Sequence, residues 1–102
     1  MGFFRQQPDI NQGVQAYGAA PGAVLLDVRT PQEYRQGHIP GSENIPLQAL
    51  EEAGRYPKDT PIFVYCHSGS RSRQAAAMLG AMGYTQVKNI GGIAAYVGKV
   101  VR

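Results

Sequence analysis

The sequence contains a single cysteine, Cys66, and no tryptophan among its 102 residues. One cysteine cannot close an internal disulfide bond, so the chain lacks the framework of a small secreted, disulfide-stapled domain. A lone free thiol indicates a reducing setting, and we expect a cytoplasmic protein. No apolar run approaches the roughly 20 residues that span a bilayer. The amino terminus also lacks the apolar stretch of a signal peptide, so we expect no membrane association.

Acidic residues are fewer than basic ones, seven against ten, which gives a net charge of +3. The basic residues are scattered along the chain and do not alternate with aromatic residues, as a nucleic-acid-binding surface would require. We therefore expect no nucleic-acid partner. Arg71 and Arg73 stand close to the cysteine, and their positive charge favours small anionic ligands there.

The chain length allows one domain, 1–102, with residues 1–8 as a frayed lead-in. Apolar runs typical of strands alternate with segments typical of helices, which predicts an α/β fold. We expect a small, mainly parallel sheet flanked by helices on both faces. The expected strands are 23–28, a brief one at 42–45, the central 62–65, and 85–90.

Helix signals stand between the expected strands. Asp9 or Asn11 is placed to cap a first helix that ends near Gly18. Thr30 and Glu33 have the spacing of a capping box, so a short helix is expected there. A further small helix is expected over 47–53, with Leu47 and Leu50 turned inward.

Two more helices are expected towards the carboxyl terminus. The helix after the cysteine has apolar residues at helical spacing, which predict its buried face: Ala75, Met78, Leu79 and Met82. Gly83 is expected to end this helix. Gly91-Gly92 is expected to start a final helix with Ile93, Tyr96 and Val97 turned inward.

Cys66 stands between the central strand and the helix that follows it. The unpaired N–H groups of a first helical turn carry about half an elementary charge. They favour a thiolate over a thiol, whose ordinary pKa is about 8.5, and they bind anions. Gly69 can take a positive φ that turns successive N–H groups inward. The simpler interpretation is a polar surface turn with Ser70 as the N-cap, and the two are compatible because the geometry of the cap itself turns these N–H groups inward.

Four separated motifs resemble those of the rhodanese-like domain, a single-domain sulfurtransferase. They extend over most of the chain, from about Ile10 to Val97. The motifs are Leu-Asp-Val-Arg-Thr-Pro-Gln-Glu-Tyr at 26–34, Gly-His-Ile-Pro-Gly-Ser-Glu-Asn-Ile at 37–45, Cys-His-Ser-Gly-Ser-Arg at 66–71 and Asn-Ile-Gly-Gly-Ile at 89–93.

The resemblance implies a thiosulfate sulfurtransferase of the rhodanese type. Cys66 would be the catalytic nucleophile, which takes the outer sulfur of a donor such as thiosulfate, releases sulfite and holds the sulfur as a persulfide. A thiophilic acceptor, cyanide or a thiol, would then remove it. No metal and no organic cofactor is implied. The residues expected to bind the small anionic donor are His67, Ser68, Gly69, Ser70 and Arg71.

The chain departs from the family pattern at two positions. His67 stands where many members carry arginine, which weakens the expected attraction for a doubly charged donor near neutral pH, because imidazole titrates near 6.5. Tyr96 replaces a tryptophan in the final segment. Structural roles are expected for His38 in its turn and for the polar cluster of Asp27, Arg29 and Glu33.

Two other functions remain open. The first is a persulfide carrier, or a binding module, that serves a protein sulfur acceptor without free turnover. The second is a phosphatase or arsenate reductase on the same fold, which places five residues between cysteine and arginine. Cys66 and Arg71 enclose only four residues, and Arg73 is too distant, so the spacing favours sulfur transfer.

Overall fold

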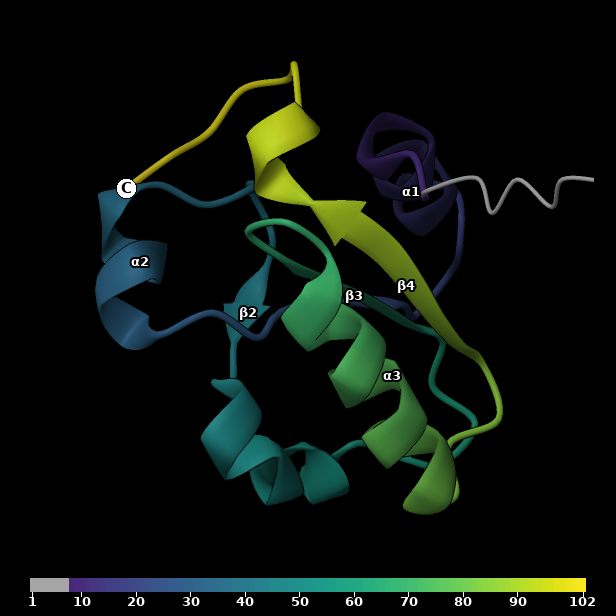
Figure 1. Cartoon of the computed structure of the whole chain (residues 1–102). Coiled ribbons are helices and arrows are strands. Elements are labelled where there is room, and N and C mark those ends of the chain that lie inside the picture. The colour runs from purple at the N-terminus through teal and green to yellow at the C-terminus, as the bar shows by residue number, and fades with distance from the viewer. Residues whose placement is uncertain (1–7) are drawn as a thin grey trace, which may run out of the picture.

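The structure is a computed structural model, and it describes residues 8–102. The lead-in expected at residues 1–8 therefore lies, apart from Pro8, outside the described residues. Four parallel strands form one sheet in the order β2-β1-β3-β4. They are β1 (Val24–Asp27), β2 (Glu43–Asn44), β3 (Ile62–Cys66) and β4 (Val87–Gly92). Figure 1 labels β2, β3 and β4. The predicted parallel α/β sheet is confirmed, with β3 between β1 and β4.

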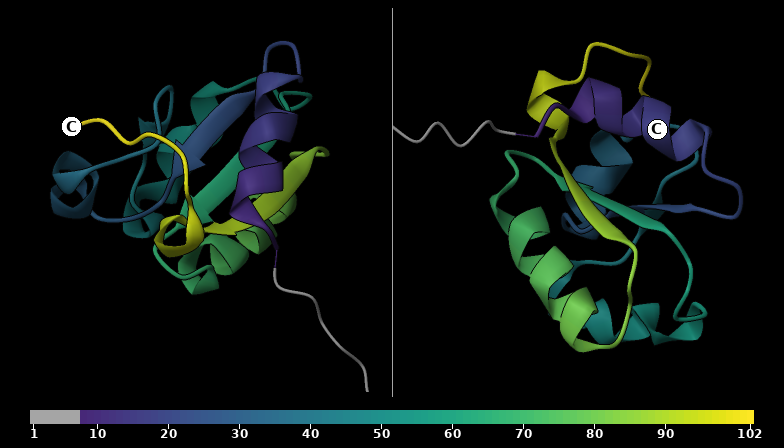
Figure 2. Two further views of the ribbon diagram at one scale, coloured as in Figure 1. Left: turned by 90° about the horizontal axis from the view of Figure 1, so that it is seen from above. Right: turned by 90° about the vertical axis from the view of Figure 1, so that its right-hand side faces the viewer.

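All five residues of β3 are buried, because helices cover both faces of the sheet. Successive side chains point to opposite faces. Phe63 and Tyr65 therefore face α1 (Ile10–Gly18), while Val64 and Cys66 face α3 (Ser70–Ala81). Figure 2 shows α1 on one side of the sheet and α3 on the other. This alternation places the thiol beneath the first turn of α3.

Each face has its own core. On the α1 side the buried residues are Ile10, Leu25, Ile39, Phe63, Tyr65 and Ile90. On the other side α3 packs beside a 3-10 segment, η1 (Leu47–Arg55), which is kinked at Ala49. The buried residues there include Leu26, Val28, Ile45, Leu50, Val64, Cys66, Ala75, Leu79 and Tyr84.

The local capping signals are confirmed. Asp9 caps α1 by accepting a hydrogen bond from the N–H of Asn11, at 2.9 Å. Thr30 and Glu33 form the capping box of α2 (Pro31–Gln36). Gly83 follows the end of α3 with φ +105°, a conformation that glycine adopts without strain.

Two expectations about buried side chains are wrong. Met78 is 44% exposed, because the fully buried face of α3 consists of Ser72, Ala75 and Leu79, and Met78 lies beside that face. The final helix is only a three-residue 3-10 turn, η2 (Ile93–Ala95). The backbone is extended at Tyr96, and Val97 is 87% exposed instead of inward.

The last strand also differs from its expected bounds. It starts at Val87 and continues to Gly92, because Gly91 and Gly92 pair with Tyr65 and Cys66 of β3. The glycine pair thus ends a strand instead of starting a helix. Its pairing brings β4 directly alongside the residue that carries the thiol.

Candidate active site

Cys66 ends β3, and its side chain is fully buried. The N–H of Gly69 donates a hydrogen bond to Cys66 Sγ at 3.0 Å. Gly69 has φ +103°, as expected, and it is the N-cap of α3, so the expectation of Ser70 in that place is wrong. Ser70 is instead the first residue of the helix. The loop is therefore only three residues long and curls tightly round the sulfur.

Ser72 adds a hydroxyl group beside the thiol. It is fully buried, and its Oγ lies 3.5 Å from Cys66 Sγ. The same hydroxyl lies 2.7 Å from Asn89 Oδ1 and 3.1 Å from the carbonyl oxygen of Gly69. A hydroxyl has a single proton, so it donates to Asn89 while the thiol is protonated and is free to donate to the sulfur once the thiol ionises.

The surroundings of the sulfur favour its ionised form. Burial by itself raises the pKa of the Cys66 thiol, because it disfavours the charged form. Hydrogen bonds from the hydroxyl and N–H of Ser72 and from the N–H groups of Gly69 and Ser68 outweigh burial, so this pKa lies below its ordinary value. These donors point at the atom where a nucleophile's charge resides.

The end of β4, at Gly92, lies directly against the backbone of the loop. A methyl group at Gly92 would overlap the carbonyl oxygen of His67 and lie 2.6 Å from the Cα of Ser68. The N–H of Ala94, in η2, donates to the same His67 carbonyl at 3.1 Å. Only a residue without a side chain allows β4 and the loop to approach this closely.

Arg71 lies in the first turn of α3, and its guanidinium points at α2. It donates to Glu33 Oε1 at 2.7 Å and to Glu33 Oε2 at 3.0 Å. These hydrogen bonds hold the pKa of the Glu33 carboxyl at about 2, well below its ordinary value. The positive charge of Arg71 is thus neutralised by a carboxylate of the protein itself.

Asp27 and Arg29 form a separate, buried ion pair, with Arg29 Nη2 2.8 Å from Asp27 Oδ2. Arg29 also donates to the carbonyl oxygen of Gly37 at 2.7 Å, which fixes the turn after α2. The expected cluster is therefore divided: Glu33, on α2, pairs with Arg71 of the active-site helix, and the other two residues hold β1 to the turn. His38 stacks on Tyr34 with ring centroids 3.7 Å apart, a packing contact.

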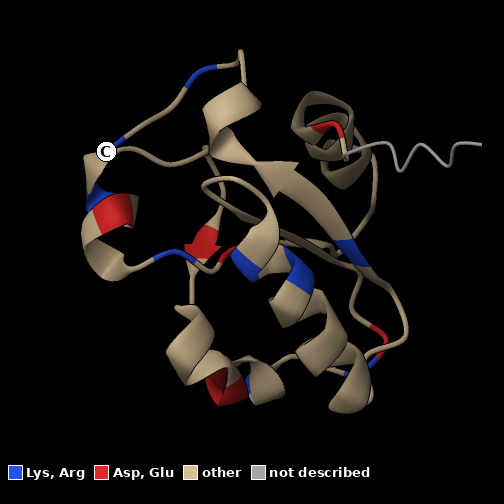
Figure 3. Ribbon diagram, in the orientation of Figure 1, with Lys and Arg blue, Asp and Glu red and all other residues tan. Residues whose placement is uncertain are grey.

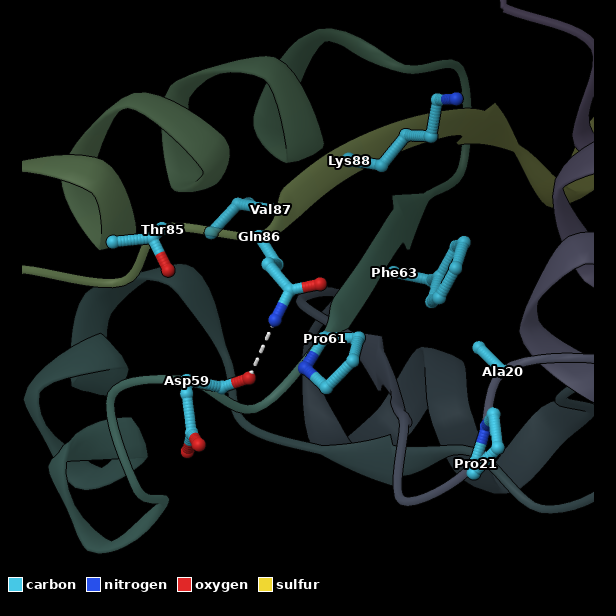
Figure 4. A pocket seen from close by; sticks show the side chains of 9 residues that line it. All are labelled: Ala20, Pro21, Asp59, Pro61, Phe63, Thr85, Gln86, Val87 and Lys88. Carbon is cyan, nitrogen blue, oxygen red and sulfur yellow. Dashed lines mark hydrogen bonds between the residues drawn. The ribbon is translucent and has the colours of Figure 1, made fainter.

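A pocket of about 450 Å³ adjoins the loop at His67, which is exposed. Its walls come from α2, η2 and the last residues of the chain, including Gln36, Gly37, Ile93, Ala94 and Val100. A larger hollow of about 760 Å³ lies at the amino ends of β3 and β4, lined by Pro61, Phe63 and Lys88 among others (Figure 4). That hollow is at the opposite end of the sheet from Cys66, so it plays no part in the chemistry of the thiol.

Among residues 8–102, no group of three or more His, Cys, Asp or Glu side chains could hold a metal ion. No helix within the same range is both long enough and apolar enough to cross a membrane.

Sequence-based reasoning pointed to Cys66 and its loop, but it missed Ser72 beside the sulfur and Asn89, which accepts a hydrogen bond from Ser72. A signal for Ser72 is present, since it is the third residue after the N-cap Gly69. Helical side chains point back towards the amino terminus of their helix, and the Cys66 thiol lies at the amino terminus of α3. Nothing local marks Asn89, because it reaches Ser72 from a neighbouring strand.

Comparison with known proteins agrees with this geometry. Residues 11–99 match the sequence profile of the rhodanese-like domain. The chain is 45% identical over 71 residues to thiosulfate sulfurtransferase PspE of Escherichia coli strain K12, covering 67% of this chain and 68% of PspE. It is 40% identical over 67 residues to the putative sulfur carrier protein YrkF of Bacillus subtilis strain 168, covering 65% of this chain and 36% of YrkF.

A solved structure described as a rhodanese with anions from E. coli superposes with a TM-score of 0.71 and 37% sequence identity. The superposition covers 78% of this chain and 98% of that one. The profile match extends over most of the sequence and contains all but the first of the helices and strands in full. The chain belongs to the rhodanese-like domain family.

Proposed function

We propose that this protein is a sulfurtransferase that carries a sulfane sulfur on Cys66. The observation that supports this most directly is the convergence of the Gly69 N–H and the Ser72 hydroxyl on one buried thiol. Donors placed in this way stabilise both a thiolate and the persulfide anion that it forms. The relatives named as sulfurtransferases support the same reaction class.

Thiosulfate is the proposed donor. The Cys66 thiolate attacks the outer sulfur of thiosulfate, a bond forms between the two sulfurs, and the bond to the sulfonate breaks, so that sulfite leaves with the electron pair. A second nucleophile, cyanide or a thiol, then attacks the sulfane sulfur, and Cys66 leaves as a thiolate. No outside oxidant or reductant is needed, and one cysteine suffices.

The residues round the sulfur divide the remaining tasks. His67, Ser68 and Ser70 are exposed and are the proposed contacts for the donor, while Gly69 supplies an N–H to the sulfur. Because Arg71 is neutralised by Glu33, we assign it to positioning of the loop and not to attraction of the donor. The cytoplasm is the proposed setting, since a reducing compartment keeps a lone thiol available.

The decisive variant is Cys66→Ser. It should lower the turnover of thiosulfate and cyanide to background without changing the circular dichroism spectrum, because serine fits the same buried site. Mass spectrometry of the wild type after exposure to thiosulfate should show a gain of one sulfur atom at Cys66. Substantial turnover by the variant, or an unmodified cysteine in a turning-over wild type, would contradict the assignment.

A persulfide carrier is the second candidate, favoured by the relative named a putative sulfur carrier protein. A carrier forms the same Cys66 persulfide but gives its sulfur slowly to cyanide and quickly to a partner. Single-turnover transfer from the loaded protein to cyanide, compared with transfer to thiols, separates the two candidates.

A further inference from the structure

The last seven residues, 96–102, form a segment that is hydrogen-bonded to the rest of the protein near each end, and we call it the C-terminal strap. It runs from η2 to the turn after α2, beside the active-site pocket (Figure 1). At its start the N–H of Val97 donates to Asn11 Oδ1 at 3.0 Å. At its end the backbones of Val101 and His38 exchange hydrogen bonds of 2.8 and 2.9 Å. The strap is therefore held at both ends, and its middle faces solvent.

The strap presents apolar side chains to solvent next to the pocket. Val97 is 87% exposed and Val100 is 48% exposed. Val100 also lines the 450 Å³ pocket, together with Ile93 and His67. Val100 therefore places an apolar side chain at the rim of this pocket.

The charged side chains of the strap itself, Lys99 and Arg102, are both basic. The charged residues that line the pocket are neutralised within the protein, Arg29 by Asp27 and Glu33 by Arg71. Lys99 and Arg102 on the strap and Arg35 on α2 are exposed, and among residues 8–102 none of the three is in an ion pair. Figure 3 shows basic but no acidic segments along the strap.

We propose that the strap docks an acidic segment of a protein whose cysteine accepts the sulfane sulfur. This inference rests on the proposed function, and it names the class of acceptor. The acceptor thiolate attacks the sulfane sulfur held on Cys66, a bond forms between these two sulfurs, and the bond to Cys66 Sγ breaks. The acceptor becomes a persulfide, and Cys66 leaves as a thiolate.

The surface fits a protein better than a nucleic acid. Single-stranded nucleic acids are bound by stacking bases on exposed aromatic side chains. The one aromatic residue of the strap, Tyr96, is half-buried and packs over Gly98. Two exposed valines, one on each side of Lys99, suit an amphipathic protein surface, and the positive charge would speed its encounter with an acidic partner.

The test uses three synthetic peptides of equal length, each with one cysteine flanked by aspartates, by serines or by lysines. The full chain is loaded with sulfur from thiosulfate, and kcat/KM for transfer to each peptide is measured. At low salt the aspartate peptide should exceed the lysine peptide by about tenfold, and the difference should shrink as salt is added. Equal rates for the three peptides would overturn the proposal.

Charge reversal then locates the effect. The double variant Lys99→Glu and Arg102→Glu should invert the order of the peptides, and Val97→Ser should slow transfer to all of them. The matched control, Lys58→Glu and Lys88→Glu, changes the net charge equally but leaves the strap intact, so it should keep the wild-type order. A control that inverts the order as well would overturn the proposal.

Two further measurements separate this proposal from its alternatives. Transfer to 2-mercaptoethanol, a small neutral thiol, should be the same in the strap variant and the wild type. If neither the wild type nor the strap variant transfers sulfur to 2-mercaptoethanol, the proposed sulfurtransferase function itself is overturned. A short single-stranded oligonucleotide and an aspartate peptide that lacks cysteine are then added as competitors. Strong inhibition of peptide transfer by the oligonucleotide alone would favour a nucleic-acid partner and contradict the proposed acidic protein partner.

Discussion

The guanidinium of Arg71 donates two hydrogen bonds to the carboxylate of Glu33, from Nη1 at 2.7 Å and from Nη2 at 3.0 Å. The pair joins the first turn of α3 to α2, two segments far apart in the sequence. Glu33 also accepts from the N–H of Thr30 at 3.0 Å, so one carboxylate serves both the cap of α2 and the active-site helix. The position of the thiol loop therefore depends on α2.

The first prediction concerns this pair. Glu33→Gln keeps the capping function, since glutamine also serves in a capping box, but removes the charge that holds Arg71. If Arg71 positions the loop, Glu33→Gln and Arg71→Gln should each lower kcat with thiosulfate by about tenfold, because small misplacements of reacting groups are costly. The double variant should be no worse than either single one, since all three lose the same interaction.

The kinetic pattern distinguishes positioning from donor binding. An Arg71 that contacts thiosulfate directly would give a different result: Arg71→Gln would raise KM, and Glu33→Gln would leave kcat unchanged. That pattern would contradict the assignment of Arg71 to positioning.

The second prediction is a pH dependence of stability. The hydrogen bonds from Arg71 lower the pKa of Glu33 to about 2 in the folded protein, against about 4.3 for an unperturbed glutamate. A carboxyl with a lowered pKa stabilises the fold above its unfolded pKa, and this contribution disappears as the pH falls towards 2. The pair is one-third exposed, so we expect a contribution of about 1 kcal/mol.

Urea unfolding of the wild type and of Glu33→Gln at several pH values measures this contribution. The wild type should be more stable at pH 6, and its advantage should decline steadily below pH 4.5. An advantage that stays constant down to pH 2 would show that Glu33 keeps its ordinary pKa.

The parts of the fold that were predicted from the sequence depend on local signals. Thr30 and Glu33 are three residues apart, and the capping box they form is confirmed. The alternation of strands and helices predicts a parallel sheet, which in turn places Cys66 at the end of its central strand, before a helix. Features of this kind depend on residues that are close together in the sequence, so the sequence alone predicts them.

The parts that were missed depend on contacts between distant segments. Gly91-Gly92 carries the composition of a helix start, but pairing with Tyr65 and Cys66 continues the strand. The backbone is extended at Tyr96 after η2 instead of continuing a helix, and Val101 pairs with His38. The ion pair of Arg71 with Glu33 was not expected, because the local pattern predicted a role for Glu33 in the capping box of α2. No local pattern records which of two possible partners a charged side chain takes.

The third prediction concerns the hydroxyl beside the thiol. Ser72→Ala removes a hydrogen bond that favours the ionised sulfur, so the pKa of Cys66 should rise. Alkylation by iodoacetamide, followed as a function of pH, reports this pKa because only the thiolate reacts. Ser70→Ala is the matched control: it removes a hydroxyl from the same helical turn, but one that is exposed.

The control should leave the alkylation profile of Cys66 at its wild-type position. If Ser72→Ala leaves it there too, then the hydroxyl donates only to Asn89, and the backbone N–H groups alone hold the thiolate. In that case Ser72 is a packing residue of the loop and not a partner of the sulfur.

The last prediction compares two glycine-to-alanine substitutions. Gly92 has φ −123° and ψ 140°, a conformation open to any residue, so the obstacle to alanine there is steric alone. The added methyl group would overlap the carbonyl oxygen of His67 and push the loop away from β4. Gly92→Ala should therefore lower sulfur transfer at least about tenfold and destabilise the fold by about 1–3 kcal/mol.

Gly80, in α3, is the matched control, because nothing lies within 4 Å of an added methyl group there. Gly80→Ala should stabilise the protein by about 0.5–1 kcal/mol and leave sulfur transfer unchanged, since alanine favours a helix over glycine. The displaced loop of Gly92→Ala should also move its N–H donors from Cys66 and raise the pKa of the thiol. Full activity with an unshifted alkylation profile in Gly92→Ala would mean that the loop tolerates a side chain at the end of β4, and that its close contact with Gly92 does not hold the thiol's donors in place.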